Sequence, residues 1–251
     1  MEGPSLFLAA QQLQPFAKKR ILQISGNSKI GIERLEKQTV KSIFSWGKHL
    51  VFQFDSFALR VHFMLFGSFE ATVAGKPVTG DYKKKARIPR LTLKFSNGHM
   101  EMYSCSLKYL EEKDAKLTYD FSVNVMSKQW DELQAMKKTL TFPDEQIGDV
   151  LLDQEIFAGV GNIIKNEILF MARVNPERKI KDIPKPKLKK LISLTRSFSF
   201  QFYEWRKKFV LRKHLLMYRK SACPHCGGKV IRASTGKRKR WSFYCPLCQG
   251  A

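Results

Sequence analysis

The chain has 251 residues, 43% of them hydrophobic, and carries 45 Lys and Arg against 22 Asp and Glu. This length and composition suffice for one large domain or two smaller domains with hydrophobic cores, and they exclude a disordered tail. The formal charge of +23 is far from that of an ordinary enzyme and indicates an anionic partner.

The positive charge is concentrated toward the end of the chain. Residues 201–251 hold 13 Lys or Arg and a single acid, Glu204, which leaves +12 in that segment. A nucleic acid suits such a surface because each phosphate contact releases condensed counterions, and an anionic membrane surface would also accept it. Membrane insertion is excluded, because every apolar run is far shorter than the ~20 residues of a spanning helix. The first residues do not resemble a signal peptide, so we expect a cytoplasmic protein of bacterial type, associated with the nucleoid.

Residues 1 to about 126 are predicted to form strands after a short opening helix. Apolar and polar residues alternate in several segments, and Gly or Asn separates some of them. The segments are 48–54, 58–63, 90–95 and 99–103. This pattern predicts an antiparallel β-sandwich with a flanking helix.

From about residue 127 the hydrophobic period becomes helical. The predicted helices are 129–138, 143–157, 162–171 and 188–212. Thr141 is the expected start of the second helix, since Asp144 and Glu145 would face the positive end of its dipole. A basic stretch with prolines, 175–187, precedes the last helix, whose aromatic side chains we interpret as core.

Four of the five cysteines have the spacing of a zinc ribbon. They form two CxxC pairs with 18 residues between them: Cys223, Cys226, Cys245 and Cys248. Four thiolates can bind one zinc ion tetrahedrally, whereas a redox dithiol would need only one pair. We therefore predict one structural Zn²⁺ per chain, and we interpret Cys105 as a small buried residue.

A tight glycine turn at 157–162 separates two predicted helices. Gly159 and Gly161 permit close approach of a ligand, and the backbone amides at the start of the next helix point outward, which favours an anion site. Asn162 either caps this helix or offers its amide to a phosphate, and the residues alone leave both interpretations open.

The α-amino group of Met1 is the amine of the chain that loses its proton most easily. Its ordinary pKa of ~8, against ~10.4 for lysine, leaves roughly a tenth of it unprotonated near pH 7. Glu2 beside it could move protons during attack on a carbonyl or masked aldehyde. Nearly every protein has such an amine, so these two residues alone do not establish a reaction.

Three motifs together resemble the formamidopyrimidine-DNA glycosylase and endonuclease VIII family. Residues 1–4 resemble the P-E-G-P opening of mature endonuclease VIII, residues 151–167 resemble the helix-two-turn-helix signature, and the zinc ribbon is similar to that of the family. They occur in family order over nearly the whole chain. The resemblance implies an α+β fold with an N-terminal antiparallel β-sandwich (1–126), a helical helix-two-turn-helix domain (127–215) and a C-terminal zinc ribbon (216–251).

The resemblance also implies roles for individual residues. The amine of Met1 would attack C1′ of the damaged nucleoside to give a Schiff base, and Glu2 would move protons during ring opening and β-elimination. Lys48 matches the hairpin lysine, Asn162 the turn residue and Arg240 the zinc-finger arginine, which the family places on phosphates near the lesion. Without the resemblance, Arg240 would be interpreted as one more exposed cation.

Two positions depart from the family pattern. Family enzymes expose a proline after methionine removal, whereas Met1 itself occupies that place here. Because Glu2 is too bulky for ordinary methionine removal, we expect a primary amine, which forms an imine. Ser5 stands where bacterial members usually carry a second glutamate, so a proton-transfer or sugar contact would be altered.

Met64, Leu65 and Phe66 lie where endonuclease VIII places three residues that fill the gap left by a flipped base. The alternative is that this strand end is core. In the purine-specific branch an arginine on the next loop contacts the orphaned base, but here Leu107, with Lys108 beside it, falls at that place. The missing arginine favours oxidised pyrimidines.

The sequence therefore predicts a monomeric, bifunctional DNA glycosylase and abasic-site lyase of base excision repair. Its partner would be duplex DNA containing damaged bases or abasic sites, and no membrane. The alternative is a damaged-DNA or abasic-site binding protein whose catalysis is weakened. A third hypothesis is non-specific binding of RNA or an anionic membrane by the basic tail.

Overall fold

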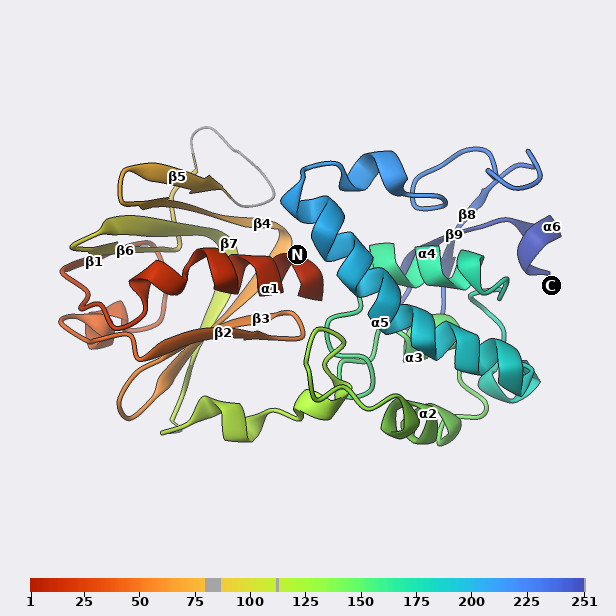
Figure 1. Ribbon diagram of the computed structural model, residues 1–251, viewed down its shortest axis with the longest axis horizontal. Helices are drawn as coiled ribbons and strands as arrows, with labels where there is room; N and C mark the ends of the chain where they lie inside the picture. Colours follow the sequence, from red (N-terminus) through yellow and green to blue (C-terminus); the bar gives the residue numbers. More distant parts are fainter. Residues whose placement is uncertain (80–86, 112, 251) are drawn as a thin grey trace. The chain divides into compact units, whose positions relative to one another are not determined.

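The computed structural model describes residues 1–79, 87–111 and 113–250. The chain divides into two compact units, Met1–Tyr119 and Asp120–Ala251. Strands dominate the first unit and helices the second (Figure 1), as the change of hydrophobic period near residue 127 predicts. The finer division of the second unit into a helical domain and a ribbon stays a prediction. No helix in the described ranges is both long enough and apolar enough to span a membrane.

The first unit is built on one antiparallel sheet. Its strands are hydrogen-bonded in the order β1-β6-β7-β4-β3-β2, and β5 pairs with β4. The long strands β4 and β7 pair with each other, β4 also pairs with β3 and β5, and β7 also pairs with β6. The register of β4 and β7 shifts between Phe63 and Ser68, where a bulge bends the pair. The strands are β1 (Gln23–Ser25), β2 (Ser42–Trp46), β3 (His49–Gln53), β4 (Ala58–Val73), β5 (Lys76–Thr79), β6 (Leu91–Phe95) and β7 (Gly98–Leu110).

A large hydrophobic core, separate from a small cluster of Val51, Ala58 and Ala115, holds the first unit together. It combines residues of helix α1 (Gly3–Gln12) with residues from both halves of the sheet, and α1 packs against β2 and β3 (Figure 1). The core contains Cys105, which is 3% exposed. The predicted sandwich with a flanking helix is thereby confirmed, as is the interpretation of Cys105. Short 3₁₀ helices complete the unit: Gln14–Phe16, Ile32–Leu35 and Ala115–Thr118.

In the second unit, α5 packs against α4 and α2 (Figure 1). Phe198 and Phe202 of α5 are 5% and 2% exposed, so the interpretation of the aromatic residues as core is confirmed for these two. Phe200, Tyr203 and Trp205 are only half-buried. The helices are α2 (Glu132–Leu140), α3 (Ile147–Val150), α4 (Asn162–Met171), α5 (Lys185–Lys207) and α6 (Pro246–Gln249), with strands β8 (Ile231–Thr235) and β9 (Arg240–Tyr244) and 3₁₀ helices at Phe121–Val123, Ile180–Asp182 and Leu211–His214.

The predicted helix 143–157 is wrong. Only the four residues of α3 are α-helical in that range, because remote carbonyls take up its amides: Ile147 N–H donates to Arg178 O (3.0 Å) and Gly148 N–H to Pro176 O (2.9 Å). Thr141 does not start a helix either. It is the C-cap of α2, where its hydroxyl contributes to closing the last turn.

Two other helix boundaries also moved. The helix predicted at 129–138 is α2, which begins after Asp131. The Asp131 carboxylate caps it by accepting the N–H groups of Leu133 (2.9 Å) and Gln134 (3.0 Å). The helix predicted at 188–212 is α5, which runs over Lys185–Lys207. It starts earlier than predicted because a proline can occupy the first turn of a helix. The helix expected at 162–171 is confirmed.

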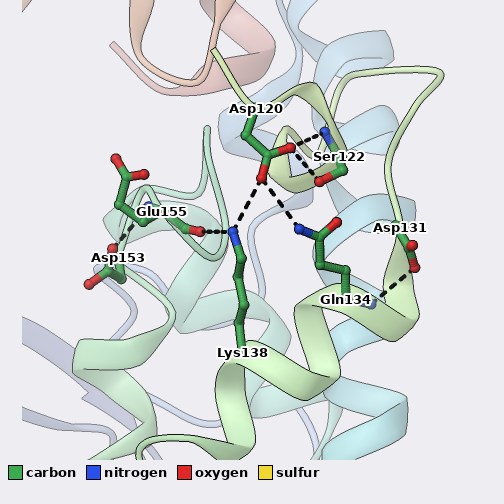
Figure 2. A network of polar contacts seen from close by, with 7 residues as sticks. All are labelled: Asp120, Ser122, Asp131, Gln134, Lys138, Asp153 and Glu155. Carbon is green, nitrogen blue, oxygen red and sulfur yellow. Dashed lines mark hydrogen bonds and ion pairs between the residues drawn. The ribbon is translucent and has the colours of Figure 1, made fainter. Parts of the chain in front are cut away.

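A polar network around Asp120 ties the start of the second unit to α2 (Figure 2). The carboxylate accepts hydrogen bonds from the backbone N–H (2.9 Å) and hydroxyl of Ser122, and from Lys138 Nζ (3.2 Å). Burial alone would raise the pKa of Asp120, but these donors outweigh it and lower the pKa. Lys138 also donates to Glu155 O (3.0 Å), which connects α2 to the residues before the glycine turn.

Glu167 of α4 anchors the segment that leads into the ribbon. Its side chain is fully buried and accepts three backbone N–H groups, from Leu216 (2.7 Å), Met217 (3.0 Å) and Tyr218 (2.7 Å). Burial raises the pKa of Glu167, while the three amides oppose that shift. A buried carboxylate is tolerated here because its oxygens are saturated with donors.

Replacing Glu167 with Gln should lower the free energy of unfolding by ~1–3 kcal/mol, because the new NH₂ group cannot accept and leaves a buried amide without a partner. Urea unfolding measures this. Glu155→Gln is the matched control, since Glu155 is exposed and its replacement should change stability by less than ~0.5 kcal/mol. Equal stabilities of the two variants would refute the anchoring role.

Candidate active site and metal centre

The N-terminal amine lies at the start of α1. Met1 packs against the hydrophobic core, and Glu2, in an extended conformation, precedes the first helical residue. Burial lowers the pKa of the Met1 amine from its ordinary value of 8.0; the Glu2 carboxylate opposes this shift and the charge of Lys48 adds to it. A buried amine of lowered pKa holds more of the uncharged, nucleophilic form at neutral pH.

Lys48 sits at the tip of the hairpin between β2 and β3. Trp46 pairs with His49, which leaves Gly47 and Lys48 as a two-residue turn. Gly47 has φ +52°, the left-handed conformation that this kind of hairpin turn needs at its first position. The turn thus brings Lys48 into electrostatic contact with the amine of Met1. The three residues predicted to be catalytic, Met1, Glu2 and Lys48, therefore lie together.

Two histidines beside these residues were missed by the sequence analysis. His49 and His62 are register partners on β3 and β4, and their rings lie 5.6 Å apart. Burial, then the charge of Arg60, lowers the pKa of His49 to about 4; burial lowers the pKa of His62, which also lies near the charged amine. Both imidazoles are therefore neutral near pH 7. The short turn at 54–57, which makes Gln53 and Ala58 register partners, is the sequence signal that could have paired them.

The three predicted gap-filling residues are all exposed. Met64 is 57%, Leu65 78% and Phe66 47% exposed, so the alternative that this strand end is core is wrong. They lie at the bulge between β4 and β7, and Phe66 has φ +63°, an unusual conformation for a bulky residue. Apolar side chains that a strained bulge keeps exposed can insert between stacked groups of a ligand or contact its apolar surface.

The expected loop at 104–109 is a strand. These residues belong to β7, where Leu107 pairs with Val61 and is buried in the core. Lys108 is exposed and pairs with Arg60 across the sheet. The alternation of buried and exposed residues along β7 explains this difference, since neighbouring strand residues point to opposite faces.

The side chain of Asn162 makes a contact that neither open interpretation described. Gly161, not Asn162, is the N-cap of α4. Asn162 is the first helical residue, and its Nδ2 donates to Trp241 O on β9 (2.8 Å). The glycine turn before it is braced by Gln154, whose Oε1 accepts the Gly159 N–H (3.0 Å). Asn162 therefore connects the turn to the ribbon.

Part of the basic run 237–240 is neutralised within the second unit. Lys237 pairs with Glu145, and Arg238 Nη2 lies 3.2 Å from Asp153 Oδ2. Arg240, the first residue of β9, is exposed and makes no ion pair within the described part of the chain. Arg240 and its neighbour Lys239, which is also exposed, are therefore the members of the run whose charges are available to an anionic ligand.

Asp149 fixes the ribbon turn from which Arg240 extends. Its carboxylate accepts the backbone N–H groups of Lys237 (2.6 Å) and Arg238 (3.3 Å). Gly236 has φ +71°, and a Cβ there would lie 2.3 Å from the Asp149 carboxylate. Only glycine permits this close approach, so the turn and the carboxylate form one rigid contact.

The four ribbon cysteines form one cluster. Their sulfur atoms all lie within 4.8 Å of one another, with Cys223 Sγ 3.8 Å from Cys248 Sγ and Cys226 Sγ 3.5 Å from Cys245 Sγ. A tetrahedral zinc ion with Zn–S bonds of ~2.3 Å needs sulfur separations of ~3.8 Å. The donor set and its spacing therefore fit a metal ion.

Purified protein should contain one equivalent of zinc, and Cys245→Ser should remove most of it, because three thiolates hold the ion much less tightly. Metal analysis by mass spectrometry measures this. Cys105→Ser, in the core of the other unit, is the control and should keep the full equivalent. Well under one equivalent in the parent protein would contradict the assignment.

Acylation of the Met1 amine should have a pH midpoint below 8.0, because burial disfavours the protonated amine. Lys48→Ala removes a positive charge that lowers this pKa, so the midpoint should rise toward 8.0. Lys94→Ala, at an exposed position of β6, should leave it unchanged. Intact-mass measurements over a pH series give the rates, and a parent midpoint at or above 8.0 would exclude the described environment of the amine.

Comparison with known proteins agrees with this architecture. Residues 123–198 match the H2TH domain of formamidopyrimidine-DNA glycosylase. The chain is 27% identical to endonuclease 8-like 3 of Homo sapiens over 99% of its length, but spans only 41% of that relative. It is 29% identical to an endonuclease 8-like protein of Acanthamoeba polyphaga mimivirus over 99% of both chains.

The solved structures that resemble the chain share its fold. A formamidopyrimidine-DNA glycosylase of Lactococcus lactis, bound non-covalently to DNA containing an abasic site, superposes with a TM-score of 0.84 over the whole of both chains at 20% identity. The fold and the four-cysteine cluster define a helix-two-turn-helix protein with a C-terminal ribbon. The H2TH match and the endonuclease 8-like relatives together support the formamidopyrimidine-DNA glycosylase and endonuclease VIII family for this chain.

Proposed function

We propose that the protein is a DNA glycosylase of base excision repair with abasic-site lyase activity, acting on oxidised bases in duplex DNA. One observation carries the proposal: the buried Met1 amine has a lowered pKa and lies beside Glu2 and Lys48. An amine in that state attacks an electrophilic carbon. The names of the relatives support the same class of activity.

In this reaction the Met1 nitrogen bonds to C1′ of the damaged nucleoside as the bond to the base breaks. Glu2 takes a proton from the attacking amine and returns it during opening of the sugar ring, which leaves a Schiff base between nitrogen and C1′. Loss of a C2′ proton then expels the 3′ phosphate by β-elimination. The positive charge of Lys48 lowers the pKa of the amine and faces the phosphate beside the sugar.

Recognition of DNA is assigned to residues of both units. Arg240 and Asn162 would contact phosphates near the lesion, while Met64, Leu65 and Phe66 fill the space left by the flipped base. Lys108 would contact the DNA beside them. Exposure of the three apolar residues supports gap filling. Oxidised pyrimidines are the favoured substrates, because Leu107, where purine-specific enzymes have an arginine, is buried in β7.

A structural zinc ion would be held by Cys223, Cys226, Cys245 and Cys248. When bound, it supplies folding free energy to a ribbon whose own core is small, and it thereby fixes β9, from which Arg240 projects. The chain's own residues perform the chemistry in the other unit. We propose that the active form is a monomer.

Borohydride trapping tests the proposed chemistry, because reduction converts the Schiff base into a stable covalent link. Duplex DNA with thymine glycol or an abasic site should yield a covalent complex, and selective acetylation of the α-amine should abolish it. Glu2→Gln should slow trapping by ~100-fold or more while changing the affinity for DNA only a few-fold.

The outcomes separate the candidate functions. A complex that forms with the acetylated protein would exclude Met1 as the nucleophile, and peptide mapping would then locate the true one. Tight, salt-sensitive binding to abasic DNA without any covalent complex would select the alternative function of a damaged-DNA binding protein. N-terminal sequencing of the tested protein establishes that Met1 carries the free amine.

A further inference from the structure

Trp241 is a large aromatic residue on the surface of the ribbon. Its side chain is 48% exposed, whereas the next two residues of β9, Ser242 and Phe243, are buried. Indole rings are usually covered by protein, since they carry much apolar surface. An exposed indole next to Arg240, in the most basic segment of the chain, therefore needs a reason other than packing.

The backbone beneath this indole is held firmly by α4. The carbonyl oxygen of Trp241 accepts hydrogen bonds from Asn162 Nδ2 (2.8 Å), Lys165 Nζ (3.4 Å) and Asn166 Nδ2 (3.4 Å). Lys165 is 1% exposed and also donates to the hydroxyl of Ser242 (2.8 Å). Three side chains of one helix thus fix the backbone of Trp241. A fixed backbone reduces the entropy that is lost when the ring binds a ligand.

One cation lies over the ring, and another precedes it in β9. The guanidinium of Arg232, on the paired strand β8, lies 4.1 Å from the centre of the Trp241 ring, a cation–π contact that orients both groups. Arg232 and Arg240 are exposed, and neither makes an ion pair within the described ranges. The surface therefore presents an exposed aromatic ring with Arg232 over it and Arg240 one residue before it in β9.

We propose that Trp241 is a stacking platform for an unpaired nucleobase, with Arg232 and Arg240 on the adjoining phosphates. A ligand that is both flat and aromatic and also polyanionic matches this surface, and single-stranded nucleic acid has that chemistry. Bases paired inside a duplex present no free face to the ring. The inference rests on the proposed DNA-binding function and adds a contact to unpaired bases, whereas Arg240 alone would contact phosphates.

Binding is compared by fluorescence anisotropy for a single-stranded oligonucleotide and a fully paired duplex of the same length. Trp241→Ala should weaken single-strand binding by ~10-fold, the typical effect of losing one stacked base, and change duplex binding by less than ~2-fold. Trp241→Phe, which keeps a flat ring, should stay within ~3-fold of the parent protein. Zinc content and circular dichroism establish that each variant retains its ribbon.

Salt dependence separates stacking from charge. Trp241→Ala should leave the slope of log affinity against log salt unchanged, whereas Arg240→Ala should make it less steep by about one. Binding of the single strand should also quench indole fluorescence in the parent protein, and Trp241→Phe, which keeps Trp46, Trp130 and Trp205, should lose most of that quenching.

Each other outcome overturns the inference. Equal weakening of single-strand and duplex binding by Trp241→Ala would make the residue structural, and parent-like binding would make it irrelevant, in both cases with the proposed function intact. Binding of the parent protein to anionic phospholipid vesicles that depends on Trp241, without such dependence for oligonucleotides, would assign the ring to a membrane surface. A parent protein that binds no DNA at all would overturn the proposed function and this inference together.

Discussion

The buried polar side of α4 is the contact on which the arrangement of the second unit depends. Lys165, Asn166 and Glu167 are consecutive residues of a helix, yet each is at most 1% exposed. Burying them is tolerable only because the ribbon and the segment before it supply matching partners. Asn166 Oδ1 accepts the Phe243 N–H (2.7 Å), while Lys165 reaches β9 and Glu167 receives the amides of 216–218. The ribbon core itself contains few buried residues, so these polar contacts determine where β9 lies.

This anchoring also changes how the high positive charge is interpreted. The cations near the ribbon turn fall into two groups. Lys237 and Arg238 are paired with acids of the same unit and help to dock the turn, whereas Arg232, Lys239 and Arg240 are exposed and make no ion pair within the described residues. A single-sign run in the sequence therefore contains both charges that are paired within the unit and charges that are not. The acids that pair with Lys237 and Arg238, namely Glu145 and Asp153, lie 92 and 85 residues earlier in the chain. The local composition of the run therefore gives no sign of this pairing.

In the first unit, burial is the main cause of the lowered pKa values near the N-terminus. The Met1 amine, His49 and His62 all have lowered pKa values for the same first reason, which is desolvation of their charged forms. The charge of Lys48 at the hairpin tip adds to the lowering of all three pKa values. The uncharged forms of these three groups are thereby favoured beside a lysine, an environment that suits attack by an amine and binding of a phosphate.

The sequence by itself determined what depends on short-range patterns. The two CxxC pairs identified the four-cysteine cluster, alternation identified the sandwich strands, and the period of α4 located that helix correctly at 162–171. Tertiary structure alone decided where non-local hydrogen bonds override local preference. Carbonyls of Pro176 and Arg178 limit the helix expected at 143–157 to α3, and Trp241 O engages the side chain of Asn162. Strand pairing placed Leu107 in the core. In each case the deciding partner is distant in the chain, and a periodic pattern carries no information about a partner that only folding brings near.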